Sequence, residues 1–301
     1  MTKIRKAVIP AAGFGTRMLP ITKVVSKEML PLVDKPILQI VVEELVEAGI
    51  EDIIVVTSAN KADMVDYFSN TAVDLTEHLR AGGPSKEALL QELESVKNLA
   101  NFAFIEQRGV YGTGTPVLNA EPYLGNEPFI YTFADDFFIA QKNSYVQMLE
   151  TYEKYQAPII GCQRRTRDAD YNRYGYVGGE EQDAGEVQIK AIVEHPGKAN
   201  TPGDLASLGG FIVTPEVLPY LQKVRDQLPA GKELLFNAAF GLMVEDGKQV
   251  IAKEIADATY FDTGNKLEYM KTVVAVAARH PEIGAQFKQF LDEFTQREKQ
   301  S

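Results

Sequence analysis

The chain has 301 residues, of which 45% are hydrophobic and 24% charged, proportions that are typical of a globular protein with a sizeable core. Its formal net charge of −11 argues against nucleic acid as a partner, because binding a polyanion needs a basic surface. The charge is uneven, since residues 1–35 hold seven lysines and arginines against two acidic residues, and this predicts a small anionic ligand near the N-terminus.

Short apolar runs alternate with helical patterns along the first half of the chain. The continuous β-branched run 52–57 is typical of a strand that is covered on both faces. The alternation predicts an α/β fold with a Rossmann-like sheet, mixed but mostly parallel, flanked by helices. Strands are predicted at 7–9, 52–57, 102–106, 129–134 and 158–163, and helices at 37–48, 61–68, 85–97, 115–124 and 144–155.

The pattern changes after about residue 165. Glycines separate short alternating runs there, which is typical of hairpins or of an added region of mixed sheet. Residues 265–298 then carry two amphipathic helices with a break at His280-Pro281. We therefore expect one domain over 1–264 and a C-terminal helical segment over 265–301. This segment either packs on the core or forms a subunit contact, and we expect a homodimer or homotetramer.

Cys162 is the only cysteine, so no intramolecular disulfide can form and a reducing compartment, the cytoplasm, is expected. Its apolar neighbours predict a small buried core residue. No apolar run is long enough for a secretory signal or a transmembrane span, so no membrane partner is expected.

A long loop follows the first predicted strand. Residues 11–36 read AAGFGTRMLPITKVVSKEMLPLVDKP, and the glycines allow the backbone to approach a phosphate and present N–H donors. A dinucleotide-binding fingerprint is disfavoured, because Met18 stands where its third glycine belongs and three prolines prevent a long helix. The basic side chains on this loop suit a triphosphate, with a forked guanidinium and mobile point charges: Arg17, Lys23 and Lys27.

This loop closely resembles the nucleotide-binding signature of the sugar-1-phosphate nucleotidyltransferase family, and in particular of its bacterial uridylyltransferase branch. The resemblance is nearly continuous over 11–36 and weaker through most of the chain, as far as 262–270 (DTGNKLEYM). It implies a mixed α/β sheet with the nucleotide on the half of about 1–140 and the sugar on the half of about 141–264. It also implies transfer of a uridylyl group from UTP to glucose 1-phosphate, with release of pyrophosphate.

Such a reaction needs no protein nucleophile, because an oxygen of the sugar phosphate attacks the α-phosphorus of UTP directly. Catalysis then comes from aligning two anions and neutralising their charge, and we assign this work to Arg17 and Lys27. We expect Mg²⁺ to help. Asp135 follows a predicted strand, where open α/β sheets place ligands, and the resemblance puts the metal-binding aspartate of the family there. Asp262 is either a second metal ligand or the N-cap of the next helix.

The resemblance also assigns residues to the two substrates. Gln107 corresponds to a glutamine that contacts uracil, although an amide cannot distinguish uracil from thymine. Gly175 lies near the hexose, Glu194 accepts hydrogen bonds from sugar hydroxyls, and His195 stands where the family carries a lysine that contacts the sugar phosphate. The other positions assigned to the nucleotide are Ala12, Gly13, Gly15, Thr16 and Gly112.

Three departures from the family pattern lie outside the triphosphate loop. They are His195, the turn 112–116 (GTGTP) and the segment 234–237 (LLFN). The sugar phosphate is therefore less firmly predicted than the nucleotide and the metal. Two alternatives stay open: an enzyme that uses dTTP or another hexose 1-phosphate, and a non-catalytic regulatory paralogue. The presence of Arg17, Lys27 and Asp135 argues against the second.

Overall fold

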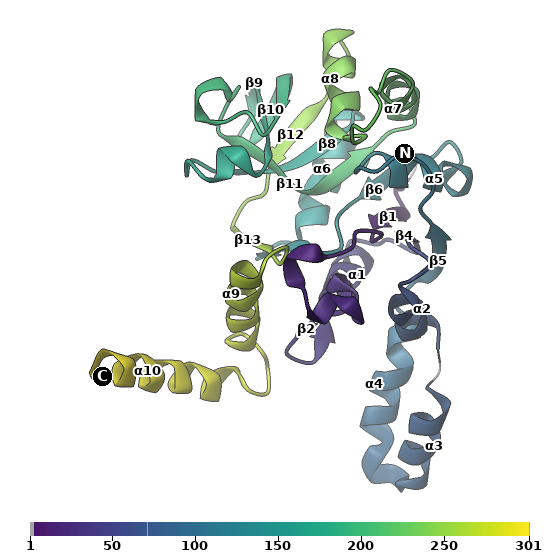
Figure 1. Ribbon diagram of the computed structural model, residues 1–301, viewed down its shortest axis with the longest axis vertical. Helices are drawn as coiled ribbons and strands as arrows, with labels where there is room; N and C mark the ends of the chain where they lie inside the picture. The colour runs from purple at the N-terminus through teal and green to yellow at the C-terminus, as the bar shows by residue number, and fades with distance from the viewer. Residues whose placement is uncertain (1–2, 71, 301) are drawn as a thin grey trace.

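The structure, a computed structural model, describes residues 3–70 and 72–300. A large sheet lies at its centre, with helices packed against it (Figure 1). Two helical arms extend away from the sheet, a hairpin on one side and the C-terminal helix on the other (Figure 1). Among the described residues, no helix combines the length and the apolar character needed to cross a bilayer.

The described strands of the main sheet lie in the order β5-β4-β1-β6-β11-β8-β12-β10-β9. In one half, β5, β4, β1 and β6 are parallel neighbours. In the other half, β11 is antiparallel to β6, β8 and β9. Among the described strands of this half, the one parallel pair is β12 with β8. The expectation of a mostly parallel sheet is therefore wrong for this half, because β11 enters antiparallel between β6 and β8. The bounds are β1 Lys6–Pro10, β4 Asp52–Thr57, β5 Asn101–Glu106, β6 Phe129–Tyr131, β8 Ile159–Arg164, β9 Gly175–Asp183, β10 Glu186–Glu194, β11 Leu205–Val213 and β12 Ile251–Glu254.

Two short antiparallel pairs lie outside the main sheet. The pair β2 (Pro31–Leu32) and β3 (Lys35–Pro36) closes the long N-terminal loop. The pair β7 (Asp136–Ala140) and β13 (Ala258–Asp262) sets Asp136 directly opposite Asp262. This second pair brings together two acidic segments that lie more than a hundred residues apart in the sequence.

The core lies on both faces of the sheet, as β1 illustrates. Ala7 and Ile9 belong to the buried cluster under α1, α2 and α6, whereas Val8 belongs to the cluster under α5, α7 and α8. Alternate residues of a strand point to opposite faces, so an uninterrupted apolar run predicts this double cover. Cys162 in β8 is buried in the second cluster, as predicted. The bounds are α1 Ile37–Glu47, α2 Ala62–Ser69, α5 Thr115–Leu124, α6 Ser144–Tyr155, α7 Val217–Asp226 and α8 Asn237–Glu245.

Some helices differ from the sequence-based expectation. Helices α7 and α8 lie in the region where hairpins or an added region of mixed sheet were expected. They contain Pro219 and Gly241, two residues that weaken a helical pattern. The projecting hairpin pairs α3 (Val73–Ala81) with α4 (Glu87–Lys97), and only α4 was expected. At the end of the chain, α9 (Lys266–Ala277) and α10 (Gly284–Gln300) follow β13.

Candidate active site

Loops that follow the carboxyl ends of β1, β5 and β6 border a cavity of about 160 Å³, here called the loop cavity. Parallel strands bring such loops to one edge of a sheet, the place where open α/β sheets bind ligands. The residues lining it include six that the sequence assigned to a site: Ala12, Gly13, Lys27, Gln107, Gly112 and Asp135.

A second cavity of about 320 Å³, the strand-end cavity, adjoins the first. The two share Asp135, Phe133, Thr113 and Glu233 in their walls. Five predicted residues line the strand-end cavity besides Asp135: Arg17, Gly175, Glu194, His195 and Asp262. The fold therefore brings residues from both halves of the chain to one continuous hollow.

Three predicted residues of the N-terminal loop lie outside both cavities. Gly15 supports the site indirectly, because a Cβ there would lie 3.2 Å from Cβ of Lys27. Its φ of 63° also favours glycine. Thr16 and Lys23 are exposed, and neither lines a cavity wall.

Lys27 and Asp135 form the central ion pair of the site. Lys27 Nζ lies 2.5 Å from Asp135 Oδ2, although the two residues come from the N-terminal loop and the end of the segment after β6. Burial by itself would lower the pKa of Lys27, but the negative charges of Asp135 and Glu28 outweigh it and raise that pKa above its usual value. Lys27 therefore carries its full positive charge at neutral pH.

Thr263 and Gly264 join the two acidic segments. The backbone carbonyl of Asp135 accepts the backbone N–H of Thr263, at 2.9 Å, and its hydroxyl, at 2.7 Å. A Cβ on Gly264 would lie 2.9 Å from Asp262 Oδ1, 3.7 Å from Asp135 Oδ2 and 3.8 Å from Arg17 Nη1. Both carboxylates and the Arg17 guanidinium therefore surround one small residue.

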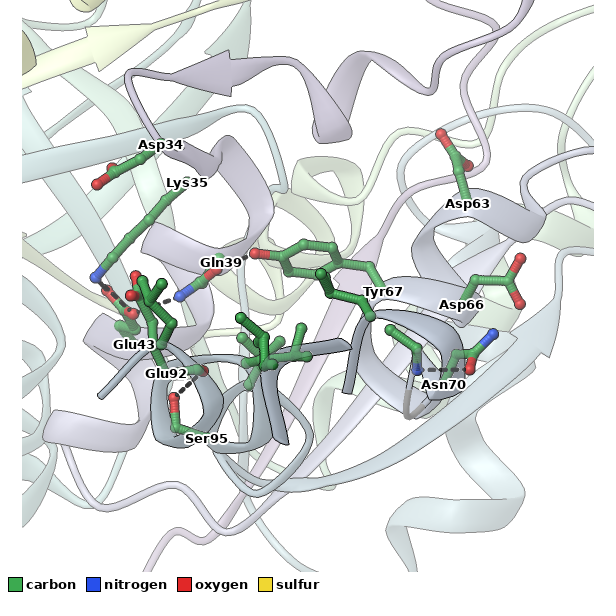
Figure 2. Close-up of a pocket in the computed structure, with 16 residues that line it drawn as sticks. Asp34, Lys35, Gln39, Glu43, Asp63, Asp66, Tyr67, Asn70, Glu92 and Ser95 are labelled. Atoms are coloured by element: carbon green, nitrogen blue, oxygen red, sulfur yellow. Dashed lines mark hydrogen bonds and ion pairs between the residues drawn. The ribbon is translucent and has the colours of Figure 1, made fainter. Parts of the chain in front are cut away.

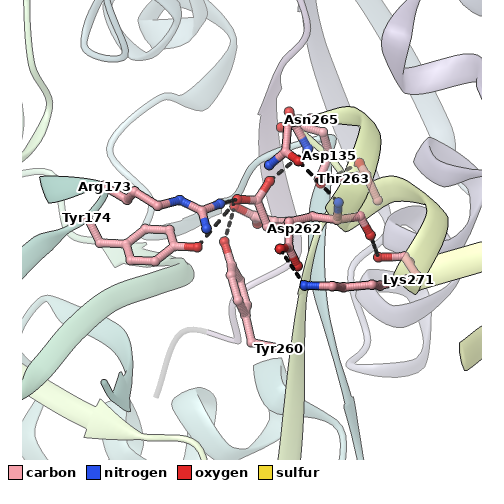
Figure 3. Close-up of polar contacts among 12 residues, drawn as sticks. Asp135, Arg173, Tyr174, Tyr260, Asp262, Thr263, Asn265 and Lys271 are labelled. Atoms are coloured by element: carbon pink, nitrogen blue, oxygen red, sulfur yellow. Dashed lines mark hydrogen bonds and ion pairs between the residues drawn. The ribbon is translucent and has the colours of Figure 1, made fainter. Parts of the chain in front are cut away.

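Asp262 points into the strand-end cavity instead of capping the next helix (Figure 3). Its Oδ2 lies 2.6 Å from Arg173 Nη2 and accepts a longer contact, 3.4 Å, from the Tyr174 hydroxyl. The N-cap of α9 is Asn265, whose side chain accepts the N–H of Glu268. The capping interpretation of Asp262 is therefore wrong, since the cap is three residues further on.

Asp136 is a buried carboxylate beside these residues. The Tyr260 hydroxyl donates to its Oδ2 at 2.8 Å, while its Oδ1 is buried and has no hydrogen-bond partner among the described residues. Burial, reinforced by the charge of Asp135, raises the pKa of Asp136 to about 8. A buried carboxylate atom without a partner next to two further aspartates is a setting that a cation would stabilise.

The protein side chains alone do not complete a metal site. Within the described residues, no group of three or more His, Cys, Asp or Glu side chains is arranged to hold a metal ion. Mg²⁺ commonly takes only one or two protein carboxylates and completes its shell with phosphate oxygens and water. Asp135 and Asp262 fit that pattern.

Glu194 lies on the opposite wall, at the end of β10. It accepts a hydrogen bond from the side-chain amide of Asn237, at the start of α8. A Cβ on Gly175 would lie 3.0 Å from that amide nitrogen and 3.1 Å from both carboxylate oxygens of Glu194. Gly175 therefore leaves the space that this pair occupies. His195 follows with a φ of 47°, in the left-handed region, and its backbone N–H donates to the Tyr174 carbonyl at 3.3 Å.

The two segments that depart from the family pattern, 112–116 and 234–237, contact each other. The backbone N–H of Gly114 donates to the Leu234 carbonyl at 2.7 Å, and that of Leu234 donates to the Tyr111 carbonyl at 2.8 Å. A Cβ on Gly112 would overlap the backbone of Leu234. The two departures from the family pattern therefore form one structural unit between the cavities.

Among the wall residues of the strand-end cavity to which the sequence gave no role, several form hydrogen bonds with the predicted carboxylates or with Asp136: Arg173, Tyr174, Asn237 and Tyr260. One had a usable signal. Tyr260 precedes Asp262 by two residues in a strand, and the period of two places both on one face. Asn237 ends the segment 234–237, which the sequence marked as a departure from the family pattern without giving it a role. Arg173 had no signal, because its partner Asp262 is distant in the sequence.

A larger cavity than these two, of about 740 Å³, lies elsewhere (Figure 2). It separates α1 and β3 from α2 and the projecting hairpin, and its walls combine leucines with carboxylates. Lys35 is the only basic residue among the described residues of its wall, and Lys35 Nζ lies 2.9 Å from a carboxylate oxygen of Glu43. This surface is unsuited to a triphosphate, so we place the candidate active site in the two smaller cavities.

Known proteins resemble this chain over most of its length. A family profile described as nucleotidyl transferase matches residues 6–279. A UTP–glucose-1-phosphate uridylyltransferase of Bacillus subtilis is 38% identical over 97% of this chain and 97% of its own. A UDP-glucose pyrophosphorylase solved with UDP-glucose is 32% identical, with a TM-score of 0.81, over 92% of this chain and 100% of that one. A UTP-bound enzyme of this kind from Acinetobacter baumannii is 30% identical, with a TM-score of 0.86, over 97% of this chain and 99% of that one.

Proposed function

The chain belongs to the nucleotidyl transferase family, and on that premise we propose that it is a UTP–glucose-1-phosphate uridylyltransferase, an enzyme that makes UDP-glucose and pyrophosphate. The observation that carries the proposal is the meeting of Lys27 with Asp135 at the wall shared by the two cavities, with Arg17 and Asp262 around Gly264. A charged cluster of this kind suits two phosphorylated substrates that react with each other.

In the proposed reaction, the phosphate oxygen of glucose 1-phosphate attacks the α-phosphorus of UTP, and pyrophosphate leaves. The two anions repel each other, so the site must neutralise and align them. Lys27 supplies a buried, fully charged ammonium near the reacting phosphates. Arg17, exposed at the mouth of the strand-end cavity, supplies a forked guanidinium for the leaving pyrophosphate.

The loop cavity is proposed to hold the nucleotide. Backbone groups of Ala12 and Gly13 and the side chain of Gln107 line it and are assigned to uracil. Gly112 also lines this cavity, and its lack of a side chain allows the backbone of Leu234 to pack directly against it. Gly15 and Thr16 are proposed to contribute to nucleotide binding indirectly, through the shape of the loop that carries Lys27.

The strand-end cavity is proposed to hold the sugar phosphate. Glu194, oriented by Asn237, accepts hydrogen bonds from glucose hydroxyls, and Gly175 leaves room beside it. His195 lies at the same wall and is assigned to the sugar phosphate. This chain differs from the family at this position, because an imidazole donates fewer hydrogen bonds than the lysine that the family carries there.

We propose Mg²⁺ as the metal, held by Asp135 and Asp262. Bound there, it would neutralise phosphate charge and increase the electrophilicity of the α-phosphorus. The unpartnered buried oxygen of Asp136 supports a cation at this place. Arg173 holds Asp262 by an ion pair at 2.6 Å and thereby keeps its carboxylate turned toward the cavity.

The assembly and the setting of the enzyme are further parts of the proposal. Residues 1–140 are assigned to the nucleotide, 141–264 to the sugar and 265–301 to a helical segment. Aromatic side chains of α10 are exposed, which supports a homodimer or homotetramer. The cytoplasm stays a prediction from the composition of the chain.

One assay tests the function and its main alternatives. Pyrophosphate release is measured with UTP and with dTTP against a panel of hexose 1-phosphates, with and without Mg²⁺. We expect the highest kcat/KM for UTP with glucose 1-phosphate, and activity only with Mg²⁺. Preference for dTTP or another sugar would identify the alternative enzyme, whereas no release from any pair would support a regulatory paralogue.

A further inference from the structure

The short turn that carries Lys27 is held from the start of α2. Lys27 begins a single 3-10 turn, Lys27–Met29. Asp63 Oδ2 accepts the backbone N–H of Ser26 at 2.7 Å, and Asp63 Oδ1 accepts the Ser26 hydroxyl at 2.6 Å. Both carboxylate oxygens of Asp63 therefore fix the residue immediately before Lys27.

The residue immediately after Lys27 is fixed from the same place. Glu28 is fully buried, and its Oε2 accepts a charge-assisted hydrogen bond from Lys61 Nζ at 2.8 Å. The Lys61 side chain is only 10% exposed. A buried ion pair resists separation, because either partner alone would be left as an uncompensated charge.

Lys61 and Asp63 are two residues apart, so one short stretch of chain contacts both neighbours of Lys27. Neither of them lines the loop cavity or the strand-end cavity. We propose that Lys61 and Asp63 are positioning residues that set where Lys27 meets the phosphates. This inference rests on the proposed function, in which Lys27 neutralises phosphate charge.

The physical need for such support follows from the lysine side chain. Its ammonium is at the end of a flexible four-carbon stem, so its position depends on a fixed backbone at its base. The loop that carries it has no helix longer than one 3-10 turn. A misplacement of about 1 Å in a site that works by alignment costs about a hundredfold in rate.

A matched control lies on the same helix. Asp66 follows Asp63 by one turn of α2, and Figure 2 shows both side chains on that helix. Both border the large cavity, but Asp66 is exposed and contacts no residue of the Lys27 turn through a described hydrogen bond. Asp66→Ala therefore removes a carboxylate from α2 but keeps the hydrogen bonds of Asp63 to Ser26.

The first test compares kcat and KM of Asp63→Ala and Asp66→Ala. We expect kcat of Asp63→Ala to fall at least about tenfold while KM for UTP changes by less than about threefold, and Asp66→Ala to match the wild type. Asp63→Asn, which keeps a carbonyl acceptor for Ser26 N–H, should lose less than Asp63→Ala. Ser26→Ala should add no further loss in the Asp63→Ala background, because both changes remove the same contact. Wild-type kcat in Asp63→Ala, or losses that multiply with Ser26→Ala, would overturn the inference.

The second test does not depend on turnover. Hydrogen exchange of the amides in 24–30 is followed by mass spectrometry in the full-length wild type and in the same variants. Asp63→Ala should raise the exchange rate of this segment at least about tenfold, and Asp66→Ala should leave it unchanged. If the segment exchanges equally in all of them, Asp63 does not hold the turn. If the exchange rises but the wild type turns over no substrate pair, the support is real and the proposed function is wrong.

Discussion

Asp135 makes two kinds of contact in this structure: its Oδ2 meets Lys27 Nζ, and its carbonyl accepts two hydrogen bonds from Thr263. Asp135→Asn keeps the backbone contacts and removes the charge that pairs with Lys27 and that we propose to bind Mg²⁺. We expect kcat to fall by about 10²- to 10³-fold with little change in the thermal midpoint.

The measurement is pyrophosphate release at several Mg²⁺ concentrations, together with thermal unfolding. Asp183→Asn is the matched control, because Asp183 also pairs with a lysine, Lys154, at 2.9 Å and lies outside both cavities. Wild-type turnover of Asp135→Asn would refute the metal assignment.

Gly175 leaves room for the pair formed by Glu194 and Asn237. In Gly175→Ala the new methyl group would meet the Asn237 amide at 3.0 Å and the Glu194 carboxylate at 3.1 Å. Displacement of Glu194 should raise KM for glucose 1-phosphate by about tenfold, which corresponds to a loss of about 1.4 kcal/mol in binding free energy. KM for UTP should stay unchanged.

Steady-state kinetics with each substrate varied in turn measures this difference. Gly241→Ala, in α8 one turn beyond Asn237, provides the control, since a Cβ there meets only Ile192 Cγ2 at an ordinary 3.6 Å. Equal effects of Gly175→Ala on both KM values would argue that Gly175 does not act on the sugar side.

Helix α1 carries a buried carboxylate that makes stability depend on pH. Glu44 Oε2 is buried without a hydrogen-bond partner among the described residues. Burial, with a smaller contribution from Glu47, raises the pKa of Glu44 to about 8. The raised pKa favours folding while Glu44 is protonated. This contribution is complete below the unfolded pKa of about 4.5 and is lost as pH rises through about 8.

We therefore expect Glu44→Gln to unfold at a higher temperature than the wild type at about pH 9, by at least about 3 °C, and to match it more closely at about pH 5. Differential scanning calorimetry at both values measures the effect. Glu153→Gln, an exposed position on α6, should change neither midpoint. A wild-type advantage at high pH would show that Glu44 is not the group responsible.

The secondary structure could be read from the sequence where its pattern is local. The apolar run of β4 and the amphipathic pattern of α1 predict their bounds to within a residue. Helices α7 and α8 were missed, because Pro219 and Gly241 hide a helical period that tertiary packing supports. A mixed sheet was predicted, but its parallel share was overestimated, because strand direction depends on which strands become neighbours.

The C-terminal helix α10 extends sideways from the rest of the molecule (Figure 1). Along α10 the rings of Phe287, Phe290 and Phe294 stack in sequence, and Phe290 and Phe294 are 50% and 47% exposed. An exposed aromatic stripe of this kind favours association. In Phe290→Ser/Phe294→Ser we expect the mass from multi-angle light scattering to fall toward that of one chain.

Tyr123→Ser, at an aromatic residue 54% exposed on α5, is the control and should keep the wild-type mass. A wild-type mass equal to one chain, or an unchanged mass in the double variant, would show that α10 does not form a subunit interface.

The sequence by itself determined the N-terminal loop, its basic residues and the position of Asp135 after the fourth strand of the parallel half of the sheet. Glycine, proline and strand-end signals act through local dihedral and hydrogen-bonding constraints, so neighbouring residues suffice to reveal them. Only the tertiary structure decided that Asp262 faces the cavity with Arg173, that Asn237 orients Glu194, and that α2 supports the Lys27 turn. These contacts join segments that are distant in the chain, and their formation depends on the order of strands in the sheet and on the packing of helices against it.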